Sequence, residues 1–275
     1  MNQPILISIC IPCYNAAPFI AETLQSVLAQ TYTNLEIIIC DDCSKDNTLE
    51  VVKTFTDPRI SVHINTHNLG GSGNYNKALS YATGKYVKLL CADDLIAPDC
   101  IEKQVHAFEE NNDKNIVLVT VEKRVINERG KSLFVKRVFW RSGLIDGRKA
   151  VCKSIRNGTN IFGEPGALLM KTDTLRKTDG VMEDKYFTYC NDFNLWCTLL
   201  LYGNLFVLRE PLFSFRIVAT SVTSSAGWKQ AKVVKDYFSL LYRQKSYGIS
   251  KSTLLLGKFM VNVMTFARNM IYKFM

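Results

Sequence analysis

The sequence comprises 275 residues, of which 47% are hydrophobic, and carries a formal net charge of +9. This length suffices for one large domain, or one domain with an extension, and neither disorder nor a bundle of membrane helices is needed to explain the composition. The nine cysteines do not indicate secretion, because the first apolar run, residues 5–11, has no basic region before it and is too short to span a membrane. A reducing cytoplasm with free thiols is therefore expected.

The positive charge is concentrated at the C-terminal end. Residues 226–275 contain nine lysines and arginines against one acid, Asp236, so this segment has a net charge of +8. The first 225 residues therefore carry only +1 of the total of +9. Arguments from basic character concern the C-terminal segment alone, and we expect no nucleic-acid partner.

Apolar, β-branched runs alternate with helical patterns in the first part of the chain. The runs lie at residues 5–11, 35–40, 60–64 and 86–90. Pro18 suits the start of a helix, after which Ile20, Leu24 and Val27 share one face. Two more helices are predicted near residues 99–111 and 192–201, whereas residues 123–166 follow no single pattern. This alternation predicts βαβ units and an α/β fold with a mostly parallel sheet flanked by helices.

Polar side chains follow each of the four predicted strands. They include Pro12-Cys13-Tyr14-Asn15, Asp41-Asp42-Cys43-Ser44, Asn68-Leu69-Gly70 and Asp93-Asp94. The carboxyl ends of parallel strands meet at one edge of the sheet, where open α/β sheets bind ligands. The adjacent carboxylates of Asp93 and Asp94 repel each other, and a divalent cation with bound phosphate would relieve that repulsion. A solvated turn is the alternative for a single pair of this kind.

These segments resemble the opening motifs of family 2 glycosyltransferases. The resemblance rests on residues 8–15 (SICIPCYN), 41–48 (DDCSKDNT), 68–70 (NLG) and 92–94 (ADD). Residues 162–167 (FGEPGA) and 191–196 (NDFNLW) are similar to the acceptor-side motifs of that family. The resemblance runs from about residue 5 to residue 225. It implies a GT-A fold, which is a Rossmann-like sheet flanked by helices, and transfer of a sugar from a nucleotide donor with inversion.

The resemblance assigns a role to each motif. It implies that the nucleotide is bound by Pro12, Tyr14, Asn15, Asp42, Asn68, Gly70 and Asp93. Asp94 would hold Mg²⁺ or Mn²⁺ against the donor diphosphate. Asp192 would be the base that takes the proton of the acceptor hydroxyl. Asp42 could instead cap a helix or close a turn, and an acid at the start of a helix, such as Asp192, is also favoured by the helix dipole.

The chain departs from the family pattern at four positions. Cys91 and Asn191 stand where relatives often carry acids, and Tyr75 stands where many carry Arg. Val218 occupies the position of a metal-binding His two residues after Arg216, and Val cannot ligate a metal. Metal binding is therefore expected to be weaker, or to rest on Asp94 alone.

Two other motifs suggest different binding sites. The pairs Cys10/Cys13 and Cys40/Cys43 have the spacing of a zinc site. They fall in or beside predicted strands, however, where residues three apart point to opposite faces, so structural zinc is disfavoured. Gly71-x-Gly73 lacks the third glycine of a dinucleotide fingerprint, because Asn76 stands in its place.

The end of the chain predicts a two-faced helix over residues 251–273. Lys and Asn residues recur on one side, and the other side carries Leu256, Phe259, Val263, Ala267, Met270 and Phe274. Lys258 and Asn262 interrupt any continuous membrane span. The apolar side could pack on the protein's own core, or it could face an anionic membrane, which the charge of +8 favours.

The sequence thus predicts a catalytic domain over residues 1–225 and a basic helical extension over residues 226–275. The favoured function is an inverting, metal-assisted hexosyltransferase that uses a UDP-sugar and a glycan or lipid-linked acceptor. It would act in the cytoplasm, at the inner face of the cell membrane, in polysaccharide synthesis. Alternatives are a sugar-phosphate nucleotidyltransferase, and a nucleotide-sugar-binding or membrane-docking protein without turnover.

Overall fold

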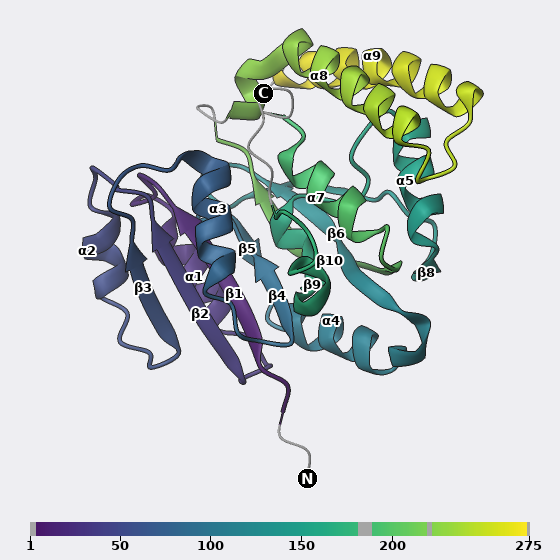
Figure 1. The fold of residues 1–275 in the computed structure, drawn as a ribbon. Coiled ribbons are helices and arrows are strands. Elements are labelled where there is room, and N and C mark those ends of the chain that lie inside the picture. The colour runs from purple at the N-terminus through teal and green to yellow at the C-terminus, as the bar shows by residue number, and fades with distance from the viewer. Residues whose placement is uncertain (1–3, 181–188, 219–221, 274–275) are drawn as a thin grey trace.

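The computed structural model describes residues 4–180, 189–218 and 222–273. It is a mixed α/β fold in which helices flank one large sheet of strand order β3-β2-β1-β4-β9-β6-β10-β5, with β7 and β8 attached to β6 and β10 (Figure 1). The C-terminal segment forms two long helices that lie beyond the carboxyl ends of the first strands (Figure 1). The predicted α/β class and helical extension are both present.

The first part of the chain builds the parallel half of the sheet. Its elements are β1 (Ile7–Cys13), α1 (Ile20–Leu28), β2 (Leu35–Asp41), α2 (Thr48–Lys53), β3 (Ile60–Ile64), α3 (Gly70–Ser80) and β4 (Tyr86–Leu89). All seven residues of β1 are buried, as expected for a strand covered on both faces. The predicted helix begins at Ile20 rather than Pro18, and it buries Ile20, Leu24 and Val27 as its spacing predicts.

The second part adds antiparallel strands, so the sheet as a whole is mixed rather than mostly parallel. Its elements are β5 (Leu95–Ile96), α4 (Cys100–Glu109), η1 (Asn112–Lys114), β6 (Ile116–Ile126), β7 (Ser132–Lys136), β8 (Gly143–Ile145), α5 (Gly147–Arg156), η2 (Pro165–Ala167), β9 (Leu168–Lys171), α6 (Thr172–Leu175), α7 (Asn191–Leu199) and β10 (Asn204–Arg216). β9 pairs antiparallel with both β4 and β6. The segment 123–166, which followed no single pattern, therefore contributes strands, a hairpin and α5.

The register of the parallel strands brings the predicted motifs together. Cys13 at the end of β1 pairs with Asp41 at the end of β2. Leu90, directly after β4, donates its N–H to the carbonyl of Cys10 at 2.9 Å. The segment leading to Asp93 and Asp94 therefore continues beside the end of β1. The predicted convergence of the strand ends on one edge of the sheet is confirmed.

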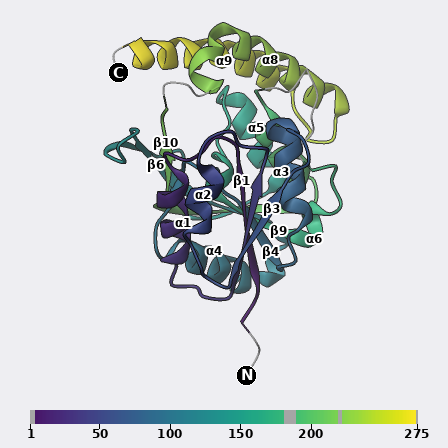
Figure 2. The same ribbon diagram turned by 90° about the vertical axis from the view of Figure 1, so that its left-hand side faces the viewer.

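The helices α8 (Val222–Gln244) and α9 (Lys251–Lys273) form a hairpin, which crosses the top of the molecule in Figure 2. The Tyr237 hydroxyl of α8 donates to Asn194 Oδ1 of α7 at 3.0 Å, in a buried contact. α9 approaches α5 so closely that a Cβ on Gly257 would lie 2.4 Å from the carbonyl oxygen of Ile155. The α8–α9 hairpin is thus packed onto α7 and α5.

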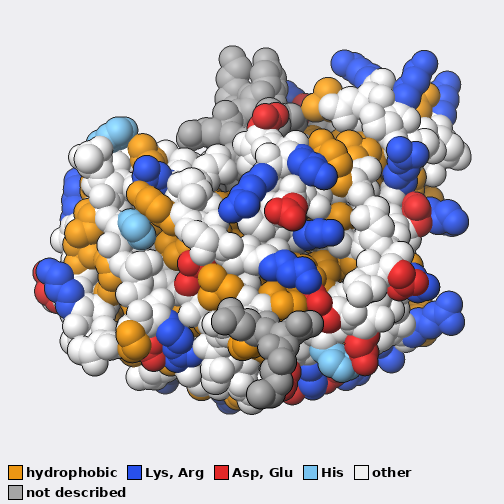
Figure 3. Space-filling view, turned by 60° about the horizontal axis from the view of Figure 1, so that its bottom comes forward, with side chains coloured by type: hydrophobic (Ala, Val, Ile, Leu, Met, Phe, Trp, Pro, Cys, Tyr) orange, Lys and Arg blue, Asp and Glu red, His pale blue; other side chains and the backbone are white. Residues whose placement is uncertain are grey.

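The surface is mixed in charge. In Figure 3, acidic and basic side chains are interspersed on the face turned to the viewer. In residues 4–180, 189–218 and 222–273, no helix has both the length and the hydrophobicity that a membrane span needs.

Candidate active site

Asp42 braces the loop that follows β3. It is buried, and its Oδ1 accepts hydrogen bonds from Asn65 Nδ2 at 2.7 Å and from the N–H of Leu69 at 2.8 Å. The carbonyl of Asp42 accepts from Asn68 Nδ2 at 3.0 Å. Asp42 does not cap α2, whose N-cap residue is Asn47. The carboxylate thus joins the end of β2 to the Asn68–Gly70 motif.

The residues after β1 form the neighbouring wall. Pro12 is buried within β1, whereas the Tyr14 side chain is 46% exposed. Asn15 has a positive φ of 51°, and its Oδ1 accepts the N–H of Lys45 at 2.8 Å. Gly70 has φ of 73° at the first position of α3, a conformation that favours glycine. Tyr14 therefore offers an accessible ring beside a loop whose shape is fixed by hydrogen bonds.

Asp93, Asp94 and Cys91 form a compact group of possible metal ligands. One ligand atom from each lies within 4.8 Å of the others. Burial, followed by the charge of Asp93, raises the pKa of Asp94 well above its usual range. Two adjacent carboxylates that repel each other fit a hard divalent cation, which takes oxygen ligands and would offset the repulsion. The Cys91 thiol is a softer donor, and the Tyr75 hydroxyl lies 3.3 Å from its sulfur.

Arg216 holds this group in position. Its side chain is fully buried, and its Nε donates to the carbonyl of Asp93 at 2.8 Å while its backbone N–H donates to Asp94 Oδ1 at 2.9 Å. Its guanidinium also binds the carbonyl of Glu128 at 2.7 Å and Glu22 Oε2 at 2.6 Å. The end of β10 thus clamps the Asp93–Asp94 turn. Val218, two residues further on, brings no ligand.

Asp192 lies in the first turn of α7, as predicted. Burial raises its pKa to about 6, and the nearby carboxylate of Glu164 adds to the shift. Its Oδ1 accepts the N–H of Phe193 at 2.7 Å, and its Oδ2 faces Asn160 Nδ2 at 3.4 Å. A carboxylate with a pKa near neutrality is suited to general base catalysis.

Tyr75 lies beside the group of possible metal ligands and near Asp192. The pKa of its hydroxyl is raised by Cys91 first, then by burial, and also by the charges of Asp192 and Asp93. Ser72 of the same helix, α3, accepts a hydrogen bond from Asn191 Nδ2 at 2.6 Å, so the start of α7 and the group around Asp94 both adjoin α3. The Tyr in place of the family's Arg therefore supplies a neutral contact at the centre of the site.

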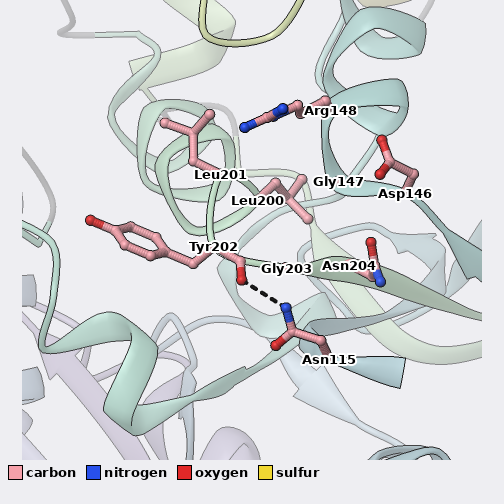
Figure 4. Close-up of a pocket in the computed structure, with 9 residues that line it drawn as sticks. All are labelled: Asn115, Asp146, Gly147, Arg148, Leu200, Leu201, Tyr202, Gly203 and Asn204. Atoms are coloured by element: carbon pink, nitrogen blue, oxygen red, sulfur yellow. Dashed lines mark hydrogen bonds between the residues drawn. The ribbon is translucent and has the colours of Figure 1, made fainter. Parts of the chain in front are cut away.

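The cysteine pairs and a pocket elsewhere in the fold are distinct from the group around Asp94. Cys10, Cys13 and Cys40 are buried and Cys43 is partly buried, and among the described residues the group around Asp94 is the one cluster of three or more potential metal ligands with ligand atoms within 4.8 Å of one another. A pocket of about 210 Å³ lies at the opposite edge of the sheet, where β6 and β10 begin. There, Asn115 Nδ2 donates to the carbonyl of Tyr202 at 3.0 Å (Figure 4). None of the predicted site residues lines it.

Several residues of the site were not predicted from sequence. Besides Arg216, they include Glu164, Asn160 and Lys88. Lys88 is buried in β4 and donates to the carbonyls of Gly166 and Leu168 at 2.8 and 3.0 Å, which ties the FGEPGA segment to the sheet. A lysine inside an apolar strand was a visible signal for this role, since buried lysines require partners.

Comparisons with known proteins identify the class that this fold and site define. The family model for glycosyl transferase family 2 matches residues 8–163, so the chain belongs to that family. A relative from Escherichia coli, UDP-Glc:alpha-D-GlcNAc-diphosphoundecaprenol beta-1,3-glucosyltransferase WfgD, is 41% identical over 107 residues. That match covers 39% of this chain and 42% of the relative, which is less than half of its length.

Solved structures show the same fold. The structure of Staphylococcus aureus TarS 1–349 in complex with UDP-GlcNAc matches 85% of this chain and 66% of that chain, with a TM-score of 0.69 and 18% identity. The mannosyltransferase PcManGT from Pyrobaculum calidifontis, in complex with GDP-Man and Mn²⁺, matches 99% of this chain and 74% of that chain, with a TM-score of 0.63 and 19% identity. The fold is GT-A, and the predicted family and fold are confirmed.

Proposed function

We propose that this chain is an inverting glycosyltransferase that transfers a hexosyl group from a UDP-sugar to a hydroxyl of a lipid-linked acceptor. One observation carries the proposal: a carboxylate with a pKa of about 6, Asp192, shares a site with the compact ligand group of Asp93 and Asp94. The first group can accept a proton, and the second can hold the donor diphosphate through a cation. Family membership favours this function over a sugar-phosphate nucleotidyltransferase.

The reaction follows from the positions of these groups. The acceptor oxygen attacks the anomeric carbon as its proton passes to Asp192, and the bond from that carbon to the UDP oxygen breaks with the electron pair leaving on UDP. A single displacement of this kind inverts the anomeric carbon. Asn160 and the N–H of Phe193 orient the two carboxylate oxygens of Asp192. The hydrogen bonds of Asp42 to Asn65 and Leu69 fix the loop after β3 before the nucleotide binds. Less conformational entropy is therefore lost on binding.

The metal would be held by Asp94, with Asp93 and Cys91 adjacent. When bound, Mg²⁺ or Mn²⁺ supplies positive charge to the leaving diphosphate. Support for this assignment comes from the ligand group itself and from the Mn²⁺ complex of PcManGT, which has the same fold. Arg216 fixes the turn that carries the two aspartates through its bonds to the carbonyl of Asp93 and to Asp94 Oδ1.

The acceptor is proposed to be a sugar carried on a lipid diphosphate. The relative from Escherichia coli is described as acting on a diphosphoundecaprenol-linked sugar, and its match covers 39% of this chain. A lipid-linked acceptor is found at a membrane surface, so an enzyme that uses it benefits from docking there.

The structure supports such docking through α9. The side of α9 that packs inward carries Leu254, Gly257, Val261 and Thr265. The apolar side is exposed, with Leu255, Leu256, Phe259, Val263, Phe266 and Met270 between 39% and 63% accessible. This side therefore does not seal the core, which was the alternative open from sequence. Together with the charge of +8 on residues 226–275, it fits an anionic membrane surface.

The test is a donor screen with direct detection of product. The protein is incubated with Mn²⁺, a panel of UDP-sugars and membrane lipid extract, and UDP release is followed. The anomeric configuration of the product is then read by NMR. Turnover with inversion supports the proposal. Tight UDP-sugar binding without transfer to any lipid fraction would instead support the binding protein without turnover.

A further inference from the structure

A pair of lysines stands face to face beside the proposed base. Lys123 of β6 and Lys136 of β7 are direct partners in the antiparallel ladder, so their side chains share one face of the hairpin. Like charges in directly opposed positions destabilise a sheet. Both side chains are also withdrawn from water, since that of Lys123 is 12% exposed and Lys136 is partly buried. An arrangement that costs stability in this way calls for a reason.

The carboxylates around this pair include Glu164, which acts electrostatically on both lysines. Glu164 forms its ion pair with Lys123. In the part of the chain that the structure describes, Lys136 has no ion pair within 4.0 Å. Burial, and then the charges of Lys123 and Arg268, lower its pKa, while Glu164 opposes them. Glu122, also buried nearby, is matched by Arg137 at 3.4 Å and Arg209 at 3.7 Å. Lys123 also acts electrostatically on Asp192 and Asp94, so Lys136 is a cation of this cluster that forms no ion pair in the described part of the chain.

The two lysines line a narrow pocket that adjoins Asp192. Glu122, Asn160, Phe139 and Phe162 line the same pocket, whose volume is about 20 Å³, so a phosphoryl group would bind at its mouth rather than inside it. The Asn160 side chain also faces Asp192 Oδ2 at 3.4 Å, so one residue borders both the pocket and the base. An anion at the mouth of the pocket would thus lie beside the place where the acceptor hydroxyl must be deprotonated.

We propose that Lys136, together with Lys123, binds a phosphoryl group of the acceptor's diphosphate and thereby sets the acceptor sugar against Asp192. This inference rests on the proposed function and adds the residues that recognise the acceptor. A phosphoryl group presents several acceptor oxygens, and hydrogen bonds between ammonium and phosphate are charge-assisted. It would also relieve the repulsion between the two lysines. A neighbouring surface for the lipid tail is available on α9, whose Arg268 acts electrostatically on Lys136.

The experiment measures binding of geranyl diphosphate by calorimetry, with and without saturating UDP and Mn²⁺, so that donor and acceptor sites are read separately. The variants are Lys136→Gln and, as a matched control, Lys131→Gln, which removes an exposed lysine from the same hairpin. Lys136→Gln should weaken the diphosphate by about tenfold or more, the usual effect of losing a charged hydrogen bond. Lys136→Gln should leave UDP affinity unchanged. Lys131→Gln should change neither the UDP affinity nor the diphosphate affinity. Lys136→Arg, which keeps the positive charge, should bind the diphosphate as the wild type does.

Stability provides a second readout. Because Lys136→Gln removes a repulsion, its unfolding midpoint should equal or exceed that of the wild type, which a merely structural lysine would not show. If Lys136→Gln fails to fold, Lys136→Met, which keeps the apolar stem of the side chain without its charge, serves as the second variant and should also lose the diphosphate. Unchanged diphosphate affinity, or no affinity in the wild type, would overturn the inference. An equal loss of UDP affinity would do the same, since the lysines would then serve the donor. Failure of the wild type to bind UDP at all would count against the proposed function instead. The titration of geranyl diphosphate in the absence of UDP would still test the role of the lysines.

Discussion

Replacing Asp192 by Asn removes the proposed base while keeping the size of the side chain. We expect transfer to fall by roughly 10²–10⁴-fold, the usual contribution of a positioned base, while UDP-sugar affinity is retained. In the wild type the carboxyl must be ionised to accept a proton. With a pKa of about 6, the ionised fraction is roughly tenfold larger at pH 7 than at pH 5. The transfer rate should therefore rise about tenfold over this interval, and the Asn variant should lack this rise.

The same substitution should raise the stability of the fold although it lowers the activity. The pKa of Asp192 is about 6 in the folded chain against 3.8 for an unperturbed Asp, so the native state binds the proton more tightly than the unfolded state. Its contribution to stability is therefore full below the unfolded pKa and is lost as pH rises through about 6. Two pKa units correspond to at most about 3 kcal/mol. Asp192→Asn should accordingly raise the free energy of unfolding at pH 8, and the gain should shrink toward pH 4.

Urea unfolding at pH 4, 6 and 8 in EDTA measures this difference, because a bound cation would itself shift the pKa. Initial rates between pH 5 and 8, with donor saturating, measure the kinetic effect. A pH-independent wild-type rate, together with an Asn variant that retains more than a tenth of the activity, would refute the assignment and leave Asp192 as an acid at a helix terminus.

Three further outcomes are expected. Asp94→Asn should abolish Mn²⁺-supported UDP binding in calorimetry, because a neutral amide does not balance the cation; unchanged affinity would contradict the metal assignment. Arg216→Met should lower the free energy of unfolding by about 3 kcal/mol or more in urea titrations, because it leaves buried carbonyls and a carboxylate without their donor. It should also weaken Mn²⁺-supported UDP binding, and normal stability with normal binding would show that the clamp is dispensable. The double substitution Phe259→Ser and Phe266→Ser should reduce co-sedimentation with anionic vesicles by roughly tenfold or more, since burying each Phe is worth about 1.5–3 kcal/mol. The thermal midpoint of the double variant should be unchanged. As a control, Val62→Ser on the exposed β3 should have no effect on sedimentation. Full sedimentation of the double variant would exclude α9 as the docking face.

The donor side of the site was predictable because its information is local. Asp93 and Asp94 follow a buried strand directly, and the carboxyl ends of parallel strands meet at one edge whatever the rest of the chain does. Asp192 was predicted from its motif, and the structure adds the cause of its raised pKa, which is burial among residues that come from distant segments. The parallel half of the sheet follows from the strand and helix spacing in the same way.

The contacts that complete the site depend on tertiary structure alone. Arg216 reaches the Asp93–Asp94 turn across 123 positions of sequence, and β9 enters the sheet antiparallel between β4 and β6, so no local pattern reports either arrangement. The opposition of Lys123 and Lys136 depends on the register of a hairpin. The helix over residues 251–273 shows both what the sequence determines and what only the tertiary structure decides. Its periodicity and ends were readable from sequence, but which face is exposed was decided by Gly257, whose missing side chain lets α9 lie against α5 on the other face.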